Sequence, residues 1–222
     1  LNFESTILAC PKHFVAYGAA QGGRDYNSAE VSDRTLNEVY LPPFLAAVRT
    51  GAGSLMCGFN DISGEPMSAN RELLTDLLRE KWIFDGFVVS DWNSIGELIN
   101  HGVAKNRVDA GEKALSAGVD MDMTSGIFGE EILKSVRKGE ISEESVDKAV
   151  RRILEVKYKL GLFENPFKYC KPEVEKAEIL KEEYIQFARE IACKSIVLLK
   201  NEGGILPLKK DLEKIAVIGP LA

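Results

Sequence analysis

The stretch Gly86-Phe87-Val88-Val89-Ser90-Asp91-Trp92 decides the fold class that we predict for this chain. Its three central apolar residues, β-branched or aromatic, are typical of a short strand buried on both faces, as in a parallel sheet. The polarity changes abruptly after Val89, and a helical pattern follows near Ile95. A buried strand that leads into a helix predicts one β–α unit of a parallel sheet.

Asp91 stands where this strand ends. In α/β barrels the C-terminal ends of the strands carry the chemistry, so Asp91 is a candidate catalytic residue. The alternative is that Asp91 only caps the following helix. Trp92 favours the first interpretation, because a flat apolar ring beside a carboxylate suits the face of a sugar.

Strand, polar strand end and helix repeat four times between residues 6 and 161. We expect strands at 7–10, 54–60, 87–89 and 119–123, a helix capped by Asn70, and a later helix between Ser142 and Gly161. Four units cannot close an eight-stranded barrel. The fold class is therefore α/β, either half of a barrel or a small open sheet.

The second part of the chain changes character. Residues 164–180 hold two prolines, many Lys and Glu and no periodicity, which predicts a linker. A helix over 180–193, a strand or extended segment over 195–200, a turn, and a strand over 215–218 predict the beginning of a second α/β domain. We therefore expect a partial barrel at 1–163, a linker at 164–180 and a truncated sandwich domain at 181–222. Both ends look cut, so we expect a piece of a longer protein.

Composition excludes several classes of protein. The chain has 222 residues, 45% hydrophobic and 28% charged, with a net charge of −6, as in an ordinary globular protein. The acidic balance argues against a nucleic-acid partner. No apolar run approaches the roughly 18–20 residues that a membrane span requires.

A metal site is not expected either. Four widely spaced cysteines form no CxxC pair, which argues against zinc; they are Cys10, Cys57, Cys170 and Cys193. Asp120 and Asp122 share one face of the strand predicted at 119–123, but a third metal ligand is missing. We predict no metal and no cofactor.

The end of the first predicted strand carries Lys12 and His13. Adjacent residues of an extended chain point to opposite faces, so both reach one pocket only if the backbone turns sharply there. The alternative is a surface lysine and a hydrogen-bonded histidine. The polar loop that follows, from Tyr17 to Ala29, is either a binding loop or a solvated one.

Several short motifs occur together and in a fixed order. They are Pro11-Lys12-His13-Phe14, Gly22-Gly23-Arg24-Asp25-Tyr26-Asn27, Val89-Ser90-Asp91-Trp92, Asp120-Met121-Asp122-Met123, Leu160-Gly161-Leu162-Phe163, and Val197-Leu198-Leu199-Lys200-Asn201 with Ile218-Gly219-Pro220. Across essentially the whole chain, they closely resemble glycoside hydrolase family 3, and within it the bacterial β-glucosidases of the periplasmic type.

The resemblance implies the C-terminal half of a (β/α)8 TIM-like barrel, followed by a linker and a second domain. It implies a retaining, exo-acting glycosidase in which Asp91 is the nucleophile. It also implies a group of sugar-binding residues, namely Lys12, His13, Met56, Phe59 and Trp92. The family motif usually has Tyr where this chain has Phe59, which puts one hydrogen bond near the nucleophile in doubt.

The resemblance further implies that the acid/base is a Glu of the second domain, beyond residue 222. The implied function is release of terminal β-D-glucose from small carbohydrates, in a periplasmic or secreted protein. A β-xylosidase, another β-glycosidase and a catalytically inactive sugar-binding fragment are the alternatives. An N-acetylhexosaminidase fits less well, because no second His follows Lys12 and His13 closely. The oligomeric state is not indicated.

Overall fold

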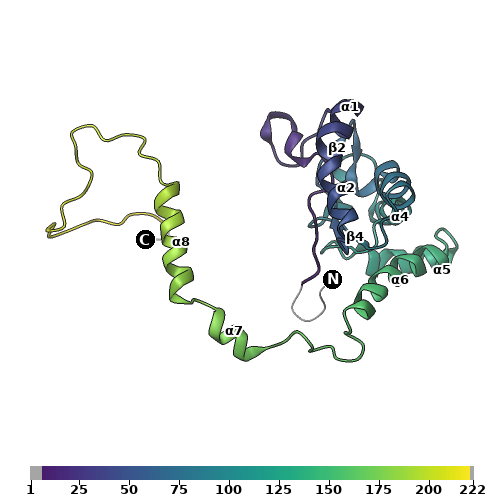
Figure 1. Cartoon of the computed structure of the whole chain (residues 1–222). Coiled ribbons are helices and arrows are strands. Elements are labelled where there is room, and N and C mark those ends of the chain that lie inside the picture. The colour runs from purple at the N-terminus through teal and green to yellow at the C-terminus, as the bar shows by residue number, and fades with distance from the viewer. Residues whose placement is uncertain (1–6, 221–222) are drawn as a thin grey trace. The chain divides into compact units, whose positions relative to one another are not determined.

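The computed structural model describes residues 7–220, and the chain divides into two compact units between Tyr169 and Cys170 (Figure 1). This division falls inside the linker that we predict at 164–180. The domain boundaries 1–163 and 181–222 stay predictions.

A parallel sheet forms the centre of the first unit. Strand β1, Ser54–Met56, pairs in parallel with β4, Phe87–Val89, with Leu55 opposite Val88. Single parallel bridges extend the sheet on both sides, from Phe14 to Cys57 and from Val89 to Met121. The four segments therefore lie side by side in chain order, as the predicted β–α repetition requires.

The strands predicted at 7–10 and 119–123 are wrong in extent. The first segment runs beside β1, where Ser54 N and Met56 N donate to Ala9 O and Pro11 O, but Pro11 has no N–H with which to continue a ladder. In the fourth segment, Asp120 and Met121 both donate to Val88 O. The Val88 N–H binds the Asp120 side chain instead of a carbonyl, which interrupts the regular pairing.

A small hairpin spans residues 61–66. Strands β2, Asp61–Ile62, and β3, Glu65–Pro66, pair antiparallel across a two-residue turn. Ser63 and Gly64 both have positive φ, 52° and 85°, as the tight turns of two-residue hairpins require.

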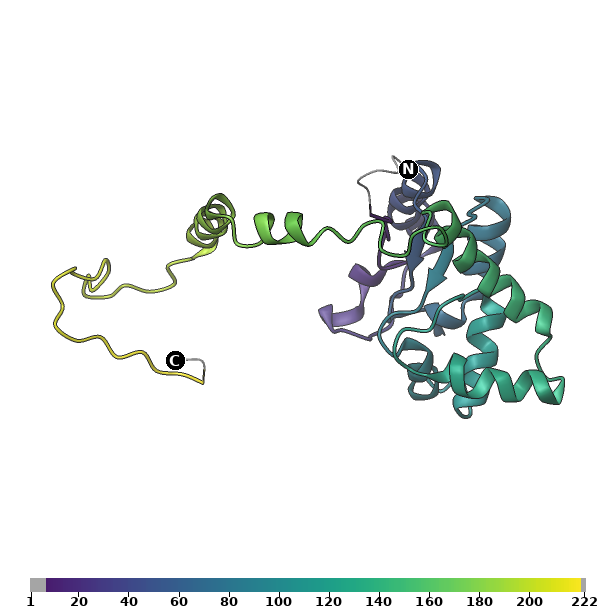
Figure 2. The same ribbon diagram turned by 90° about the horizontal axis from the view of Figure 1, so that it is seen from below.

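Helices cover the sheet of the first unit, and Figure 2 shows them from below. The α-helices are α1 (Asp33–Thr35), α2 (Leu41–Arg49), α3 (Ser94–Asn100), α4 (Arg107–Ala117), α5 (Leu133–Lys138) and α6 (Glu143–Lys159). Three 3-10 turns are η1 (Tyr17–Ala19), η2 (Gln21–Gly23) and η4 (Met67–Ala69). Three π-helical segments are η3 (Leu36–Tyr40), η5 (Glu72–Lys81) and η6 (Phe128–Ile132).

Two helix boundaries confirm the sequence prediction. Ser142 caps α6, since its side chain accepts from Ser145 N. Asn70 caps the helical segment that follows it, since its Oδ1 accepts from Leu73 N. Apart from these two boundaries, Gly118 ends α4 with φ 112°, a left-handed conformation that favours glycine.

The core of the first unit joins sheet and helices. Phe14, Leu55, Val88 and Val119, one from each sheet segment, are fully buried. They belong to one cluster with Leu74 and Leu78 of η5 and Ile95 and Leu98 of α3. This packing fixes the sheet segments against the helices, and so fixes the edge on which the strands end.

The second unit has helices but no strand among its described residues. Helix α7, Pro172–Glu178, lies inside the predicted linker and begins at a proline, which suits a first helical position. Helix α8, Glu182–Ser195, confirms the helix predicted at 180–193. The strand predicted at 215–218 is wrong, and residues 195–200 form no strand either, because an apolar β-branched run forms a strand only when another strand pairs with it. No described helix is both long and apolar enough to cross a membrane.

Candidate functional site

The structure brings Asp91 and His13 together at the C-terminal edge of the sheet. Asp91 Oδ2 lies 3.3 Å from His13 Nε2, and the two side chains are 10% and 25% exposed. His13 precedes the bridge residue Phe14, and Asp91 follows β4 by two residues. Parallel segments end on the same edge, which is why residues distant in sequence meet here.

The carboxylate of Asp91 is only partly bonded. Its Oδ1 accepts from Trp92 N at 2.7 Å, whereas its Oδ2 is buried and accepts no hydrogen bond within residues 7–220. Helix α3 begins at Ser94 without a side-chain cap. The interpretation of Asp91 as a helix cap is therefore wrong, and one oxygen of a buried carboxylate remains available for chemistry.

The end of β4 is held by the fourth sheet segment. Ser90 N donates to Met121 O at 2.9 Å, and Met123 N donates to Ser90 Oγ at 2.8 Å. Asn93 N donates to Met123 O at 2.8 Å. These bonds flank Asp91 on both sides and fix the backbone from which its side chain projects.

His13 lies in a partly buried position among charged neighbours. Burial lowers its pKa below the ordinary value of 6.5; Asp91 opposes this shift, Lys12 adds to it, and Asp25 opposes it. Lys12 itself is exposed, and the Lys12–His13 peptide bond is cis. The neutral imidazole is favoured, so His13 can both donate and accept hydrogen bonds.

Four rings form an aromatic file that starts at His13, the neighbour of Asp91, and continues through Tyr17 and Phe59 to Tyr26. The centroid of Tyr17 lies 5.1 Å from that of His13 and 6.1 Å from that of Phe59, and Tyr26 lies 4.4 Å from Phe59. The sequence marked Phe59 as a sugar-pocket wall but gave Tyr17 and Tyr26 no role. The positions of both tyrosines depend on contacts that short-range patterns do not reveal.

The other residues of the predicted sugar-binding group follow the same strands. Met56 ends β1 opposite Val89 and is half-buried. Trp92 follows Asp91, with 64% of its surface exposed. Both lie near the edge that carries Asp91, and their roles in binding stay predictions.

Asp120 and Asp122 are already engaged by protein donors. Asp120 binds Arg79, Arg152 and the Val88 N–H. Asp122 accepts from Ser125 N and Oγ and from Phe128 N. Within the described part of the chain, no three His, Cys, Asp or Glu side chains gather as a metal site would require. The four cysteines are free, and burial raises the pKa of the Cys57 thiol.

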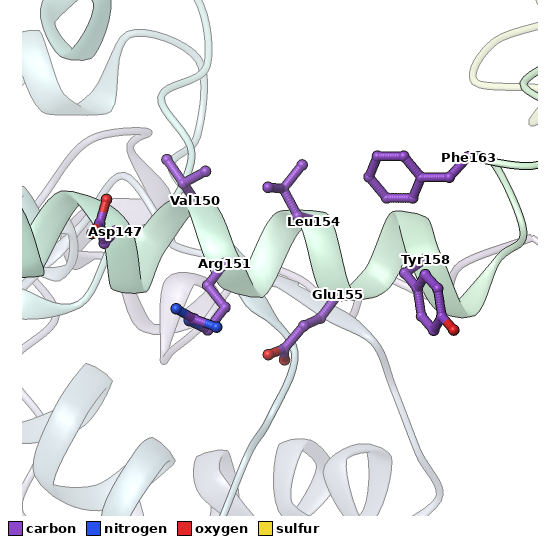
Figure 3. A pocket seen from close by; sticks show the side chains of 7 residues that line it. All are labelled: Asp147, Val150, Arg151, Leu154, Glu155, Tyr158 and Phe163. Carbon is purple, nitrogen blue, oxygen red and sulfur yellow. The ribbon is translucent and has the colours of Figure 1, made fainter.

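A separate hollow of about 440 Å³ lies along α6 (Figure 3). Its lining residues are Asp147, Val150, Arg151, Leu154, Glu155, Tyr158 and Phe163. It contains none of the predicted site residues, and its apolar side chains are strongly exposed. The hollow is therefore distinct from the chemistry at Asp91.

Comparison with known proteins identifies one family. Residues 3–156 match the model of the glycosyl hydrolase family 3 N-terminal domain. The chain is 40% identical over 220 residues to a periplasmic β-glucosidase of Salmonella typhimurium, covering 98% of this chain and 29% of that protein. It is 43% identical over 229 residues to a β-xylosidase of Formosa agariphila, and this match covers 99% of this chain and 31% of that protein.

Solved structures agree. The crystal structure of a β-glucosidase from Listeria innocua is 41% identical, with a TM-score of 0.78, and covers 92% of this chain and 28% of that chain. The complex of that enzyme with glucose is 40% identical, with a TM-score of 0.77, and the match covers 91% of this chain and 28% of that chain. The α/β fold of this chain thus matches that of its relatives, and the chain spans less than a third of their length.

Proposed function

Because the chain belongs to glycoside hydrolase family 3, we propose that it carries the nucleophile of a retaining β-glycosidase and that Asp91 is this nucleophile. The observation that supports the proposal best is the placement of Asp91. Its carboxylate is buried at the C-terminal edge of the sheet. One of its oxygens, Oδ2, lies 3.3 Å from His13 Nε2 and accepts no hydrogen bond from the described residues.

The chemistry follows from two carboxyl groups. A retaining glycosidase holds them about 5–5.5 Å apart, one as nucleophile and one as acid/base. Under the proposal, Asp91 attacks the anomeric carbon while the acid/base protonates the departing oxygen, which leaves a glycosyl ester on Asp91. Water, deprotonated by the same acid/base, then releases the sugar with its original configuration. We take the acid/base to be a Glu outside these 222 residues, as the family resemblance implies.

The remaining site residues hold the sugar. His13 and Lys12 are proposed to hydrogen-bond hydroxyls of the terminal sugar, and the distance from His13 to Asp91 supports this role for His13. Met56, Phe59 and Trp92 are proposed as walls of the pocket. An apolar ring beside a sugar ring excludes water and strengthens the hydrogen bonds on its other side.

The substrate that we propose is a terminal β-D-glucoside. A β-xyloside is the second candidate, because relatives of nearly equal identity are β-glucosidases and β-xylosidases. An inactive sugar-binding protein is the third, and it would bind sugar without turnover.

A covalent label tests the assignment of Asp91. The complete polypeptide that carries this sequence is incubated with 2-deoxy-2-fluoro glucosides and xylosides, digested and analysed by mass spectrometry. The sugar should be found on the peptide containing Asp91, and the sugar that labels faster identifies the substrate. Asp91→Asn is the matched control and should not be labelled. A label on another carboxylate would refute the assignment.

A further inference from the structure

The loop from Tyr17 to Ser28 brings two rings of the aromatic file to the candidate site. Tyr17 packs edge-to-face against His13, at the inner end of the file. Tyr26 packs on Phe59 at the outer end and is 46% exposed. A hollow of about 360 Å³ opens on the same loop. The file thus runs from His13, which lies beside Asp91, to the exposed phenol of Tyr26.

The backbone of Tyr26 is held in an unfavourable conformation. Its φ is 63°, in the left-handed region that bulky non-glycine residues rarely adopt. Tyr26 N donates to Asp25 Oδ1 at 3.1 Å, which supports this local geometry. Such conformations persist only where surrounding contacts impose them, and they gather at ligand-binding sites.

Asp61 anchors the stem of the loop that carries Tyr26. Ser28 Oγ donates to Asp61 Oδ2 at 2.7 Å, and Ala29 N donates to Asp61 O at 2.9 Å. Asp61 is 4% exposed; its Oδ1 accepts from Gly64 N at 2.8 Å, and His101 Nδ1 lies 3.8 Å from its Oδ2. Gln21 N closes the loop by donating to Ser28 O at 3.0 Å. The exposed tip therefore stands on a fixed base.

The surroundings of the phenol suit a hydrogen-bond donor. Partial burial raises the pKa of Tyr26, and the carboxylates of Asp25, Glu97 and Asp91 add to this effect. The hydroxyl therefore keeps its proton at neutral pH, in the electrostatic field of the proposed nucleophile. A neutral hydroxyl can donate to a sugar hydroxyl and can also accept from one.

We propose that Tyr26 contacts the bound sugar through its hydroxyl and ring, and that Asp61 is a positioning residue that holds Tyr26 in place through Ser28. This inference rests on the proposed function, since it assigns a further substrate contact to the same site.

The first arm of the test compares tyrosine variants in the complete polypeptide. Tyr26→Phe removes only the hydroxyl, and Tyr26→Ala removes the ring as well. KM for an aryl β-glucoside and the Kd of glucose should both rise about tenfold in Tyr26→Phe, the effect of one lost hydrogen bond, and further in Tyr26→Ala. Tyr158→Ala, an exposed tyrosine of α6, is the matched control and should change neither constant.

The second arm tests positioning with a double-mutant cycle. Ser28→Ala should raise KM and the Kd of glucose by part of the Tyr26→Ala effect. The combined variant should bind no worse than Tyr26→Ala alone, because Ser28 acts only through Tyr26. Asp61→Asn keeps one oxygen acceptor, so it should retain more glucose binding than Asp61→Ala. The two variants are compared under conditions in which their thermal stability is equal.

The outcomes separate this inference from the proposed function. Wild-type labelling and turnover, with unchanged KM and glucose affinity in both Tyr26 variants, would overturn the contact while leaving the glycosidase intact. Additive effects of Ser28→Ala and Tyr26→Ala would overturn the positioning role of Asp61. A wild-type protein that binds no glucose and forms no covalent label would overturn both proposals.

Discussion

Asp120 Oδ1 accepts a 2.6 Å hydrogen bond from Arg152 Nη1 and so joins the fourth sheet segment to helix α6. The other oxygen of Asp120 binds Arg79 of η5 and the Val88 N–H. The Asp120 and Arg79 side chains are 1% and 8% exposed. Burial lowers the pKa of Arg79 to about 10, opposed chiefly by Asp120, so this guanidinium stays charged at neutral pH. One carboxylate therefore pairs with two guanidinium groups and also holds the Val88 N–H of β4, the strand that precedes Asp91.

Removing this carboxylate should destabilise the first unit strongly. Asp120→Ala leaves a buried guanidinium unpaired, and such changes cost about 3–5 kcal/mol. Arg152→Ala should cost less, because the Arg152 side chain is 30% exposed and Arg79 still pairs with Asp120. Urea unfolding measures both, with exposed Arg151→Ala as the control. Equal midpoints for Asp120→Ala and Arg151→Ala would contradict the role of Asp120.

Gly118 should not tolerate a side chain. Its φ is +112°, and an added Cβ would lie 2.8 Å from Thr75 Oγ1, which donates to Ala117 O. Gly118→Ala should therefore lower the free energy of unfolding by more than about 1 kcal/mol. Gly129→Ala in η6 is the matched control, since nothing lies within 4 Å of its added Cβ; it should be neutral or slightly stabilising. A neutral Gly118→Ala would show that the helix end rearranges freely.

Sequence patterns predicted those parts of the fold that local physics determines. The strand at Phe87–Val89 has the predicted bounds, because a buried β-branched run between turn residues allows little else. The strand predicted at 7–10 is wrong in extent because its pairing depends on which N–H groups face β1, and Pro11 removes one of these groups. The strand predicted at 215–218 is wrong because the apolar pattern of a segment says nothing about whether a partner strand is present.

The candidate site could likewise be predicted from the sequence only in part. Asp91 and His13 were each predicted at the end of a strand, and the two side chains meet because parallel strands end on one edge of the sheet. Tyr26 was missed because its position depends on a positive φ and on packing against Phe59. Neither is visible in a glycine-rich polar loop, where the default expectation is solvent.

Asp91→Asn should separate stability from function. The Asp91 side chain caps no helix, and its Oδ1 can be replaced by the amide oxygen that accepts from Trp92 N. The free energy of unfolding should therefore change by less than about 1 kcal/mol, while turnover by the complete polypeptide falls by several orders of magnitude, as expected when the nucleophile is lost. Thermal unfolding and aryl glycoside hydrolysis are measured on the same preparation. Retained turnover would exclude the nucleophile assignment, whereas a large loss of stability would show that the Asp91 carboxylate also has a structural role.

The titration of His13 should reveal the electrostatics of the site. Burial holds its pKa below 6.5, Lys12 lowers it further, and Asp91 raises it. Lys12→Ala should therefore raise the pKa of His13, and Asp91→Asn should lower it. The chain has only two histidines, so NMR titration of their ring protons can follow both, with His101→Gln assigning the signals. A shift of the His13 pKa in the opposite direction in either variant would show that the charges of Lys12 and Asp91 do not determine this pKa.

The same shift predicts how stability depends on pH. Because the folded pKa of His13 lies below its ordinary value, the unfolded chain binds more protons between the two values. The stabilisation is present above about pH 6.5 and is lost as the pH falls through the folded pKa. His13→Gln should flatten the dependence of the unfolding free energy on pH in that interval, and Lys12→Ala should make the loss smaller, because it raises the folded pKa of His13 towards 6.5. Urea unfolding at a series of pH values measures both, and an unchanged slope in His13→Gln would assign the pH dependence to other groups.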